Sequence, residues 1–439
     1  MPTTRRRGCD VSHIVGAGTW KYLVTCLHLT RHGCMDFKMP GFDQRGYHGA
    51  TVQLNSYDEW SQLKEIIVGS AENYVSHERE LSFDLFFHDN IAADNSARSD
   101  WYYPRLSVRN SKLDRERDSR MPINQRYVAE LNEDLHGIAA TLESLAVTVH
   151  RPSDVDPATH EVRTPAWSAS VVPPLNVRDN TLIVGDEIIE TPPMIRSRYF
   201  ETHLLKPIFQ EYFRRGARWT VMPRPLMTDA SFDLSYVRSN AATAGGPTEP
   251  IGDPEPSRYD VGFEMMFDAA QCLRLGRDIV ANVSTANHAL AVDWLERHLE
   301  GRFRIHRVHR LSDSHIDSMV LALRPGTLLV RSAAVAEKLP EPLQRWDLIV
   351  PPEPRSDNFP RYDDSDLVLT SPFIDLNVLS VSPDTVLVNE ACPELMRKLE
   401  QHGFTVVPVR HRHRRLFGGG FHCFTLDTVR EGGAEDYLS

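Results

Sequence analysis

The sequence predicts an α/β fold made of repeated units, and three observations support that prediction. Five stretches read as an amphipathic helix, a short break and a strand. Short paired strand segments with tight-turn signals lie between them. The spacing of the units is irregular, which excludes a strict solenoid. Two arrangements stay open: a doubly wound parallel sheet, or ββαβ modules closed around an axis, which would leave no sheet edge exposed.

The predicted elements follow one another in a regular order. Ordered structure should begin near Asn55, with a strand over 63–69 that a glycine closes. The five helix and strand pairs are 124–145 with 147–150, 200–215 with 219–223, 287–299 with 303–306, 333–345 with 347–350, and 393–402 with 404–408. Segments 181–190 and 384–390 predict strand and turn pairs between them. Residues 71–123 show no period, as in a long functional loop.

Composition narrows the class of protein. Of 439 residues, 41% are hydrophobic and 25% are charged, as in ordinary globular proteins, and no apolar run approaches the roughly 20 residues of a membrane span. The net charge of -11 argues against a nucleic-acid binder, because such affinity depends on lysine and arginine neutralising phosphates. A water-soluble protein with a small, cationic substrate fits better.

Cysteine usage and the N-terminus indicate a cytoplasmic protein. Six cysteines are scattered without a CxxC pair: Cys9, Cys26, Cys34, Cys272, Cys392 and Cys423. This supports neither a disulfide framework nor a zinc site, so we expect a reducing cytoplasm. Residues 1–50 are expected to form a poorly ordered extension, because the apolar stretch 22–29 is broken by histidines, unlike a secretory signal. A targeting arm is the alternative.

Cys423 is the best nucleophile candidate. It follows three glycines, a phenylalanine and a histidine in the segment 418–423. Three consecutive glycines do not favour a helix or a strand, so we expect them to let the backbone approach a ligand beside the thiol. His422 should point to the opposite face of a strand and is not expected to be the thiol's base. The alternative is a small buried apolar cysteine.

His315 and Asp317 could supply the proton chemistry. On a strand their spacing places both side chains on one face, so the aspartate could hold one ring nitrogen while the other moves protons. Alone, such a pair is more often a surface histidine near a carboxylate in a polar turn. Combined with Cys423, the pair fits the logic of a thiol and a remote histidine that an acid orients.

Asp179 and Asp268 lie in apolar or proline-rich company, where a carboxylate is costly without a partner. One interpretation is a structural salt bridge to Arg178, Arg274 or Arg277. The sharper hypothesis is that these carboxylates await a cationic ligand. A guanidinium is the planar cation that carboxylates bind in a bidentate manner.

The other reactive side chains have less specific surroundings. Cys272 and Cys392 are expected to be core residues on helices. His411 and His413, in the basic segment 410–415, could form a metal or anion site, but a solvated basic turn is favoured. Neither GxGxxG nor a P-loop occurs, so no nucleotide cofactor is supported.

Six parts of the chain together resemble the amidinotransferases, the family of glycine amidinotransferase and inosamine-phosphate amidinotransferases. They are 55–60 with 65–69, 174–179, 185–192 with 196–198, 267–270, 315–317 and 418–423. The resemblance runs in order from about residue 52 to the C-terminus, and 267–270 with 418–423 is its most specific part. It implies a five-bladed α/β propeller (pentein) of ββαβ modules around a central active site. It also implies that 51–439 is a single domain.

The resemblance further implies a reaction. An arginine-like donor would deliver its amidino group to a cysteine, ornithine would leave, and an acceptor amine would take the group, with no cofactor and no metal. Carried over by position, the roles are Cys423 as nucleophile, His315 as general acid and base, Asp268 as catalytic guanidinium partner, Asp179 and Asp317 in donor-guanidine binding, and Thr370 with Ser371 at the amino-acid end of the donor. The implied partners are small molecules, and a homodimer is a possible assembly.

Two positions depart from the family pattern. Where the family has an arginine that binds the donor's carboxylate, this chain has Ala334, so Arg331 is the candidate replacement and the identity of the donor stays open. Ser312 and Ser314 are smaller than their counterparts beside the acceptor of the glycine enzyme. We therefore expect an acceptor larger than glycine, such as lysine, an amino-cyclitol or a biosynthetic intermediate of specialised metabolism.

Two alternatives to a transferase stay open. In a hydrolase resembling arginine deiminase, water rather than an amine would resolve the cysteine adduct. In a propeller that has lost catalysis, guanidine compounds would only bind. The set of Cys423, His315 and Asp268 weighs against the second alternative.

Overall fold

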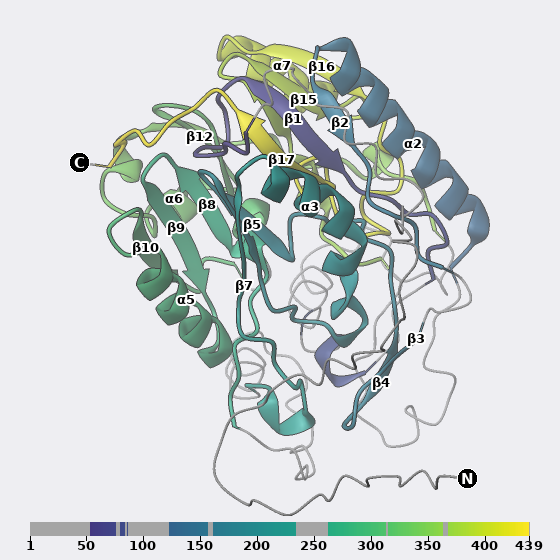
Figure 1. The fold of residues 1–439 in the computed structure, drawn as a ribbon. Helices are drawn as coiled ribbons and strands as arrows, with labels where there is room; N and C mark the ends of the chain where they lie inside the picture. The colour runs from purple at the N-terminus through teal and green to yellow at the C-terminus, as the bar shows by residue number, and fades with distance from the viewer. Residues whose placement is uncertain are drawn as a thin grey trace, which may run out of the picture. The chain divides into compact units, whose positions relative to one another are not determined.

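The computed structural model describes residues 53–75, 80–83, 86, 123–156, 161–233, 262–312, 315–362 and 368–438 (Figure 1). The expected N-terminal extension and most of the expected long loop lie outside these residues, as does Ser314. The single domain over 51–439 stays a prediction.

Four three-stranded sheets share one topology. In each, two strands form an antiparallel hairpin, and a third strand pairs parallel to the second after a helix. They are β5 (Thr181–Val184), β6 (Glu187–Glu190) and β7 (Arg218–Val221) with α3 (Lys206–Arg214); β8 (Cys272–Leu275), β9 (Asp278–Val283) and β10 (Arg304–His309) with α5 (Ala286–Leu299); β11 (Val320–Arg324), β12 (Thr327–Val330) and β13 (Asp347–Ile349) with α6 (Ala333–Ala336); and β14 (Leu379–Ser382), β15 (Thr385–Asn389) and β16 (Thr405–Val409) with α7 (Pro393–Gln401).

A fifth sheet has the same pattern but joins two distant parts of the chain. Its hairpin partner for β1 (Leu63–Val68) is the last strand, β17 (Thr425–Arg430), and β2 (Thr148–His150) pairs parallel to β1 after α2 (Gln125–Ser144). Figure 1 shows β17, in yellow, beside β1, in purple. A separate hairpin consists of β3 (Glu161–Arg163) and β4 (Ser168–Ser170). The α/β class is confirmed, and the described strands form separate small sheets rather than one doubly wound sheet.

Local sequence explains why the longest helix forms. Its N-cap is Asn124, whose side chain accepts a hydrogen bond from the amide of Arg126, which satisfies one of the free amides of the first turn. Leu131, Leu135, Ile138 and Leu142 are fully buried. Their spacing of three or four residues places them on one face, and burying each such side chain stabilises the fold by about 1.5–3 kcal/mol.

Three elements differ from the prediction. The expected helix 200–215 begins with a 3-10 turn (Glu201–Leu205), and 333–345 divides into α6 and a 3-10 turn (Leu343–Arg345) because Pro340 and Pro342 cannot continue a helix. The expected strand around Asp317 is a 3-10 turn (Ile316–Ser318). Cys272 is buried as expected, but it begins β8 rather than lying on a helix, and Cys392 is the N-cap residue of α7.

Apolar clusters fill the spaces around the sheets. The cluster that includes Leu63 and Ile66 of β1 continues through α2 to Leu387 of β15 and to Phe417 and Phe424, on either side of the glycine run. Among the described helices, none is both long and apolar enough to cross a membrane.

Candidate active site

The predicted site residues come from equivalent places in the repeated modules. Each lies in the segment just before the first strand of a sheet: Asp179 before β5, Asp268 before β8, His315 and Asp317 before β11, Thr370 and Ser371 before β14, and Cys423 before β17. Side chains far apart in sequence can therefore meet, because one topological position recurs.

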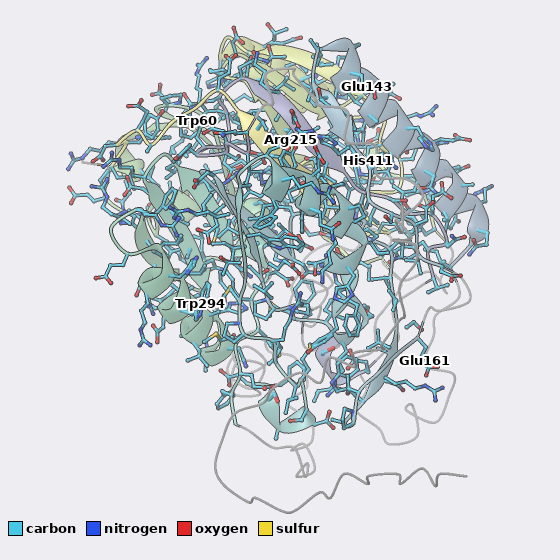
Figure 2. The ribbon with its side chains drawn as sticks, viewed as in Figure 1. Trp60, Glu143, Glu161, Arg215, Trp294 and His411 are labelled. Carbon is cyan, nitrogen blue, oxygen red and sulfur yellow. The ribbon has the colours of Figure 1, made fainter. Side chains whose placement is uncertain are left out.

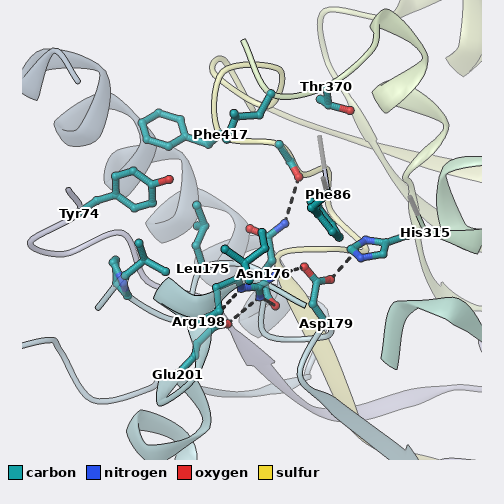
Figure 3. A pocket seen from close by; sticks show the side chains of 15 residues that line it. Tyr74, Phe86, Leu175, Asn176, Asp179, Arg198, Glu201, His315, Thr370 and Phe417 are labelled. Carbon is teal, nitrogen blue, oxygen red and sulfur yellow. Dashed lines mark hydrogen bonds and ion pairs between the residues drawn. The ribbon is translucent and has the colours of Figure 1, made fainter. Parts of the chain in front are cut away.

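A pocket opens beside these segments (Figure 3). It encloses about 560 Å³ of empty space, part of which is open solvent. Asp179, His315 and Thr370 line it, together with Gly418 from the glycine run. Cys423 is buried and lies outside the described lining.

His315 lies between two carboxylates. Its Nε2 is 3.0 Å from Asp268 Oδ2, and its Nδ1 is 3.7 Å from Asp179 Oδ1. Burial by itself lowers the pKa of His315, but the charges of Asp179 and Asp268 outweigh burial and raise that pKa to about 9. The ring is therefore an imidazolium near neutral pH and can donate a proton.

The carboxylates of Asp268 and Asp179 differ in how many of their oxygens accept hydrogen bonds. Asp268 Oδ1 accepts a hydrogen bond from the Met194 amide at 3.3 Å, and Asp179 Oδ2 accepts one from Arg198 Nη1 at 2.6 Å. Among the described residues, no donor forms a hydrogen bond to Asp179 Oδ1. Burial is the main cause that raises the pKa of Asp179. An unsatisfied buried oxygen of this kind is what a cationic ligand would bind.

Cys423 faces Asp317 rather than His315. Its Sγ is 3.4 Å from Asp317 Oδ2, and its amide donates to Asn377 Oδ1 at 2.8 Å. Asn377 also donates to Asp317 Oδ2 at 3.0 Å. Burial, followed by the charges of Asp317 and Asp179, raises the pKa of Cys423 well above its usual value. The free site therefore holds a protonated thiol.

His422 connects this site to a buried ionic network. Its Nδ1 lies 2.8 Å from Asp317 Oδ2, and its Nε2 lies 3.2 Å from Glu59 Oε2. Glu59 in turn accepts two hydrogen bonds from the Arg274 guanidinium, at 2.9 and 2.7 Å, and one from the Arg274 amide at 3.2 Å. Burial opposes ionisation of Asp317, yet the hydrogen bond and charge of His422 keep the pKa of Asp317 below its usual value.

Two expectations about these pairs are wrong. Asp317 does not orient His315, because the 3-10 turn replaces the strand and directs Asp317 to His422, while Asp268 from another module holds the histidine. The salt-bridge alternative named the wrong arginines, since Asp179 pairs with Arg198. Arg178 and Arg274 pair with Glu59 and Asp427, and Arg277 donates to a backbone carbonyl.

Sequence reasoning missed several residues of the site. Arg198 bridges Asp179 and Glu201, and all three side chains are buried. Burial raises the pKa of Glu201 to about 7, although Arg198 opposes that shift. Glu59 and Asn377 were also missed. Arg198 and Glu59 had a signal, because they lie in segments 196–198 and 55–60, which carry the family resemblance, whereas Asn377 lies in none of those segments.

The close contacts of the glycine run are with other atoms of the protein. A Cβ at Gly419 would overlap the ring of Phe424 and lie 2.9 Å from Asn176 Nδ2, and one at Gly420 would lie 2.7 Å from Asn377 Cβ. Gly418 has φ +72° and lines the pocket. Gly418 is thus the glycine of the run that lines the pocket, the next two allow close contact with other parts of the protein, and backbone approach to a ligand stays a prediction.

His411 and His413 are not on a solvated turn, and this expectation is wrong. Both are buried (His411 is labelled in Figure 2). His411 Nε2 is 3.0 Å from the Gly419 carbonyl, and His413 Nε2 is 2.6 Å from Glu130 of α2. Burial lowers the pKa of His411 to about 3, so its ring is neutral and donates to the glycine run through Nε2–H.

Thr370, Ser371 and Arg331 are the residues expected to bind the amino-acid end of the donor. Thr370 lines the pocket, and Ser371 Oγ accepts a hydrogen bond from the Phe373 amide at 3.2 Å. The Arg331 guanidinium lies 4.3 Å from the centre of the Phe373 ring, two residues from Ser371. Ala334 is exposed on α6. Ser312 is buried against Ser318 and is not among the residues described as lining the pocket.

The groups of Asp179, Asp268 and His315 lie within 4.8 Å of one another, which is close enough for a metal ion. The raised pKa of His315 opposes metal binding, because a doubly protonated ring has no lone pair to offer.

Comparison with known proteins identifies the family, although no family model matches the chain. The chain is 32% identical over 387 residues to inosamine-phosphate amidinotransferase 1 of Streptomyces glaucescens. The aligned residues cover 88% of this chain and 99% of that relative. The chain is an amidinotransferase. This amidinotransferase is also 31% identical over 396 residues to L-arginine:L-lysine amidinotransferase of Pseudomonas savastanoi pv. phaseolicola, covering 88% and 97% of the two chains.

Solved structures agree with this assignment. Inosamine-phosphate amidinotransferase StrB1 from Streptomyces griseus superposes on the amidinotransferase with a TM-score of 0.69 at 32% identity, over 88% of this chain and 99% of that one. SxtG, an amidinotransferase from Microseira wollei in the saxitoxin biosynthetic pathway, gives 0.68 at 31% identity over the same shares. The family resemblance drawn from the sequence is confirmed.

Proposed function

We propose that this amidinotransferase moves the amidino group of L-arginine, through a covalent adduct on Cys423, to a primary amine larger than glycine in specialised metabolism. One observation carries the proposal. Asp179, Asp268, Asp317, His315 and the Cys423 thiol are buried in one site, and one oxygen of Asp179 accepts no hydrogen bond from any residue that the structure describes. A guanidinium is the planar cation that satisfies such carboxylates.

The donor guanidinium supplies the charge that the free thiol lacks. Carboxylates raise the pKa of Cys423, so a cation placed between Asp179 and Asp317 would offset them and favour the thiolate. The sulfur then forms a bond to the guanidinium carbon. The bond from that carbon to the ornithine nitrogen breaks, and this nitrogen takes a proton from the His315 imidazolium. The thiol gives its own proton to solvent as the thiolate forms, and His315 is left neutral, so the step balances.

The second half-reaction runs the same chemistry in reverse. The acceptor nitrogen forms a bond to the amidino carbon, the carbon–sulfur bond breaks, and one amine proton passes to the neutral His315. The imidazolium is thereby restored, and the thiolate takes back a proton from solvent. The product is a new guanidinium and the free enzyme. Because the group rests on the enzyme between two exchanges, no further cofactor is required.

Donor positioning is assigned to the residues beside Phe373. We propose that Arg331 binds the carboxylate of arginine in place of the arginine that Ala334 replaces, and that Thr370 and Ser371 bind its amino group. The position of the Arg331 guanidinium over Phe373, next to Ser371, supports this assignment.

We also propose a wider arrangement of the repeated modules. The proposal includes a five-bladed propeller formed by residues 51–439 as one domain, with the five pre-strand segments converging on its axis. The pairing of β17 with β1 and the shared topology of the five sheets support it. We place the enzyme in the cytoplasm and keep a homodimer as the assembly to test.

Labelled arginine tests the reaction. The purified chain is incubated with labelled arginine and a panel of amines, and ornithine, the new guanidine and the mass of Cys423 are followed. We expect ornithine release, an amidino increment on Cys423, and loss of all turnover in Cys423→Ala. Citrulline without consumption of amine would make the enzyme a hydrolase, and full turnover by Cys423→Ala would refute the covalent route.

A further inference from the structure

The pocket has two chemically different ends. In Figure 3, His315 and Asp179 lie on one side, whereas Tyr74 and Phe417 lie on the other. The rings of Tyr74 and Phe417 meet edge to face with centres 5.1 Å apart. Leu175 also lines the pocket and belongs to the same apolar cluster. The end away from the reacting groups therefore has an aromatic and apolar wall, beside the paired side chains of Arg198 and Glu201, which also line the pocket.

A second apolar wall comes from a different cluster. Ile195, Leu369 and Phe86 pack together and also line the pocket. Gly418 lets this wall approach, because it has φ +72° and a Cβ there would lie 3.2 Å from Leu369 Cβ. The pocket thus passes between two apolar surfaces. Small-molecule sites combine such walls with a few polar groups that fix the orientation of the ligand.

The cations that line the described pocket are already occupied. Arg198 donates to Asp179 at 2.6 Å, to Glu201 at 2.9 Å and to the Asn176 carbonyl at 3.0 Å. His315 is held by Asp268. A phosphate brought here would meet carboxylates without an available cation in the described lining. Apart from Asp179, assigned to the donor, the carboxylate in that lining is Glu201, which Arg198 already neutralises through two hydrogen bonds, so a second ammonium would gain little for its lost hydration.

We propose that the acceptor is a primary amine carried on an uncharged, apolar body that fits between these two walls, rather than a phosphorylated amino-cyclitol or lysine. This inference rests on the proposed amidino transfer and specifies its second substrate. The donor leaves the aromatic end free, because Thr370, assigned to the donor, lies on the other side of the pocket from Tyr74 and Phe417 in Figure 3. The amine nitrogen then meets the amidino carbon beside His315.

A competition between acceptors tests the inference. The full chain is supplied with guanidino-labelled arginine and, in parallel, with phenethylamine, lysine or a phosphorylated amino-cyclitol. Mass spectrometry measures the labelled guanidine that each amine yields. We expect kcat/KM for phenethylamine to exceed that for either other amine by at least about tenfold, the scale of discrimination that apolar pockets achieve. A preference for lysine or for the phosphorylated amine would overturn the inference.

A matched pair of variants locates the effect. Phe417→Leu removes the Phe417 ring from the aromatic wall. It should reduce transfer to phenethylamine about tenfold more than it reduces ornithine release. Phe404→Leu makes the same change at a similarly buried position remote from the pocket, 4% exposed against 3%, and controls for lost stability. Equal losses in both half-reactions of Phe417→Leu would overturn the assignment of the wall.

The two proposals fail in different ways. If the unaltered protein releases no ornithine from arginine, the proposed function is wrong, and the inference falls with it. If ornithine is released and Cys423 gains the amidino mass, but phenethylamine has no advantage, only the inference about the acceptor is wrong.

Discussion

The protonation state of His315 depends on neighbours that no local sequence pattern predicts. An isolated histidine is half protonated near pH 6.5, whereas this ring lies between Asp179 and Asp268 and has a pKa of about 9. Its burial would by itself favour the neutral form. The two carboxylates therefore decide that the group is an acid at neutral pH, as the proposed protonation of the ornithine nitrogen requires.

Ornithine release should lose rate at high pH. The pKa of His315 is raised from 6.5 to about 9, so the imidazolium is present below that value and is lost as pH rises through it. Its contribution to stability follows the same course, full below about 6.5 and lost through about 9. We expect kcat/KM for arginine to fall above about pH 9. A pH profile of single-turnover ornithine release measures this.

Asp268→Asn is the companion variant for that profile. Removing one of the two charges should lower the pKa of His315 and move the falling limb to lower pH, besides slowing the reaction. A falling limb at unchanged pH would assign it to another group and contradict the acid role of His315.

At the scale of elements, the segments before the first strand of each sheet carry the chemistry, and their backbones are fixed by buried polar contacts. The last segment, before β17, depends on close backbone contacts. His411 binds the Gly419 carbonyl, and Asn377 binds the Cys423 amide. The thiol is placed by the loop and its supports rather than by its own side-chain freedom.

Gly419→Ala should damage both stability and catalysis. The new Cβ would overlap the Phe424 ring, so the loop must shift, and overpacking of this kind costs about 1–3 kcal/mol. We expect ornithine release to fall at least about tenfold, because small displacements of reacting groups are costly. Urea unfolding and single-turnover assays measure the two effects.

Gly137→Ala is the matched control. It lies on the exposed face of α2, where an added Cβ meets nothing within 4 Å. There the same change should stabilise the protein by about 0.5–1 kcal/mol, because alanine favours a helix more than glycine does. Unchanged stability and activity in Gly419→Ala would show that the loop does not position the thiol.

At the scale of the molecule, the first and last described strands are joined by β17 pairing with β1, and a buried ionic network reinforces this pairing. Asp427 of β17 accepts hydrogen bonds from Arg178, Arg274 and Arg430. Those arginines come from separate parts of the chain. Their charges outweigh burial, so the pKa of Asp427 is held well below its usual value.

Asp427→Asn should cost about 3–5 kcal/mol in the free energy of unfolding, because it leaves buried arginines without their counter-charge. Asp357→Asn removes one partner of an exposed pair with Arg355 and should change the free energy of unfolding little, because solvent screens exposed ion pairs. Equilibrium urea unfolding compares them. A loss for Asp427→Asn no larger than that of the control would contradict the structural role of the network.

The repeated order of elements was predictable, because helix and strand periodicity is local. The element boundaries at Pro340 and the 3-10 turn around Asp317 were not foreseen, since they depend on backbone turns that apolar patterns do not encode. Asp179, Asp268, His315 and Cys423 could be selected because few residue types perform such chemistry. The hydrogen-bond and ion-pair partners of these side chains could not be predicted from the sequence.

The sequence by itself determined the family, the α/β class and the candidate side chains for the proposed cysteine-based amidino transfer. These rest on residue identity, local periodicity and the order of short motifs. Only the tertiary structure decided that Asp268 rather than Asp317 holds His315 and that His422 joins Asp317 to Glu59. It also decided that aromatic and apolar side chains line one end of the pocket. Such contacts join residues a hundred or more positions apart or from separate modules, and only packing fixes which of the available partners a buried charge meets.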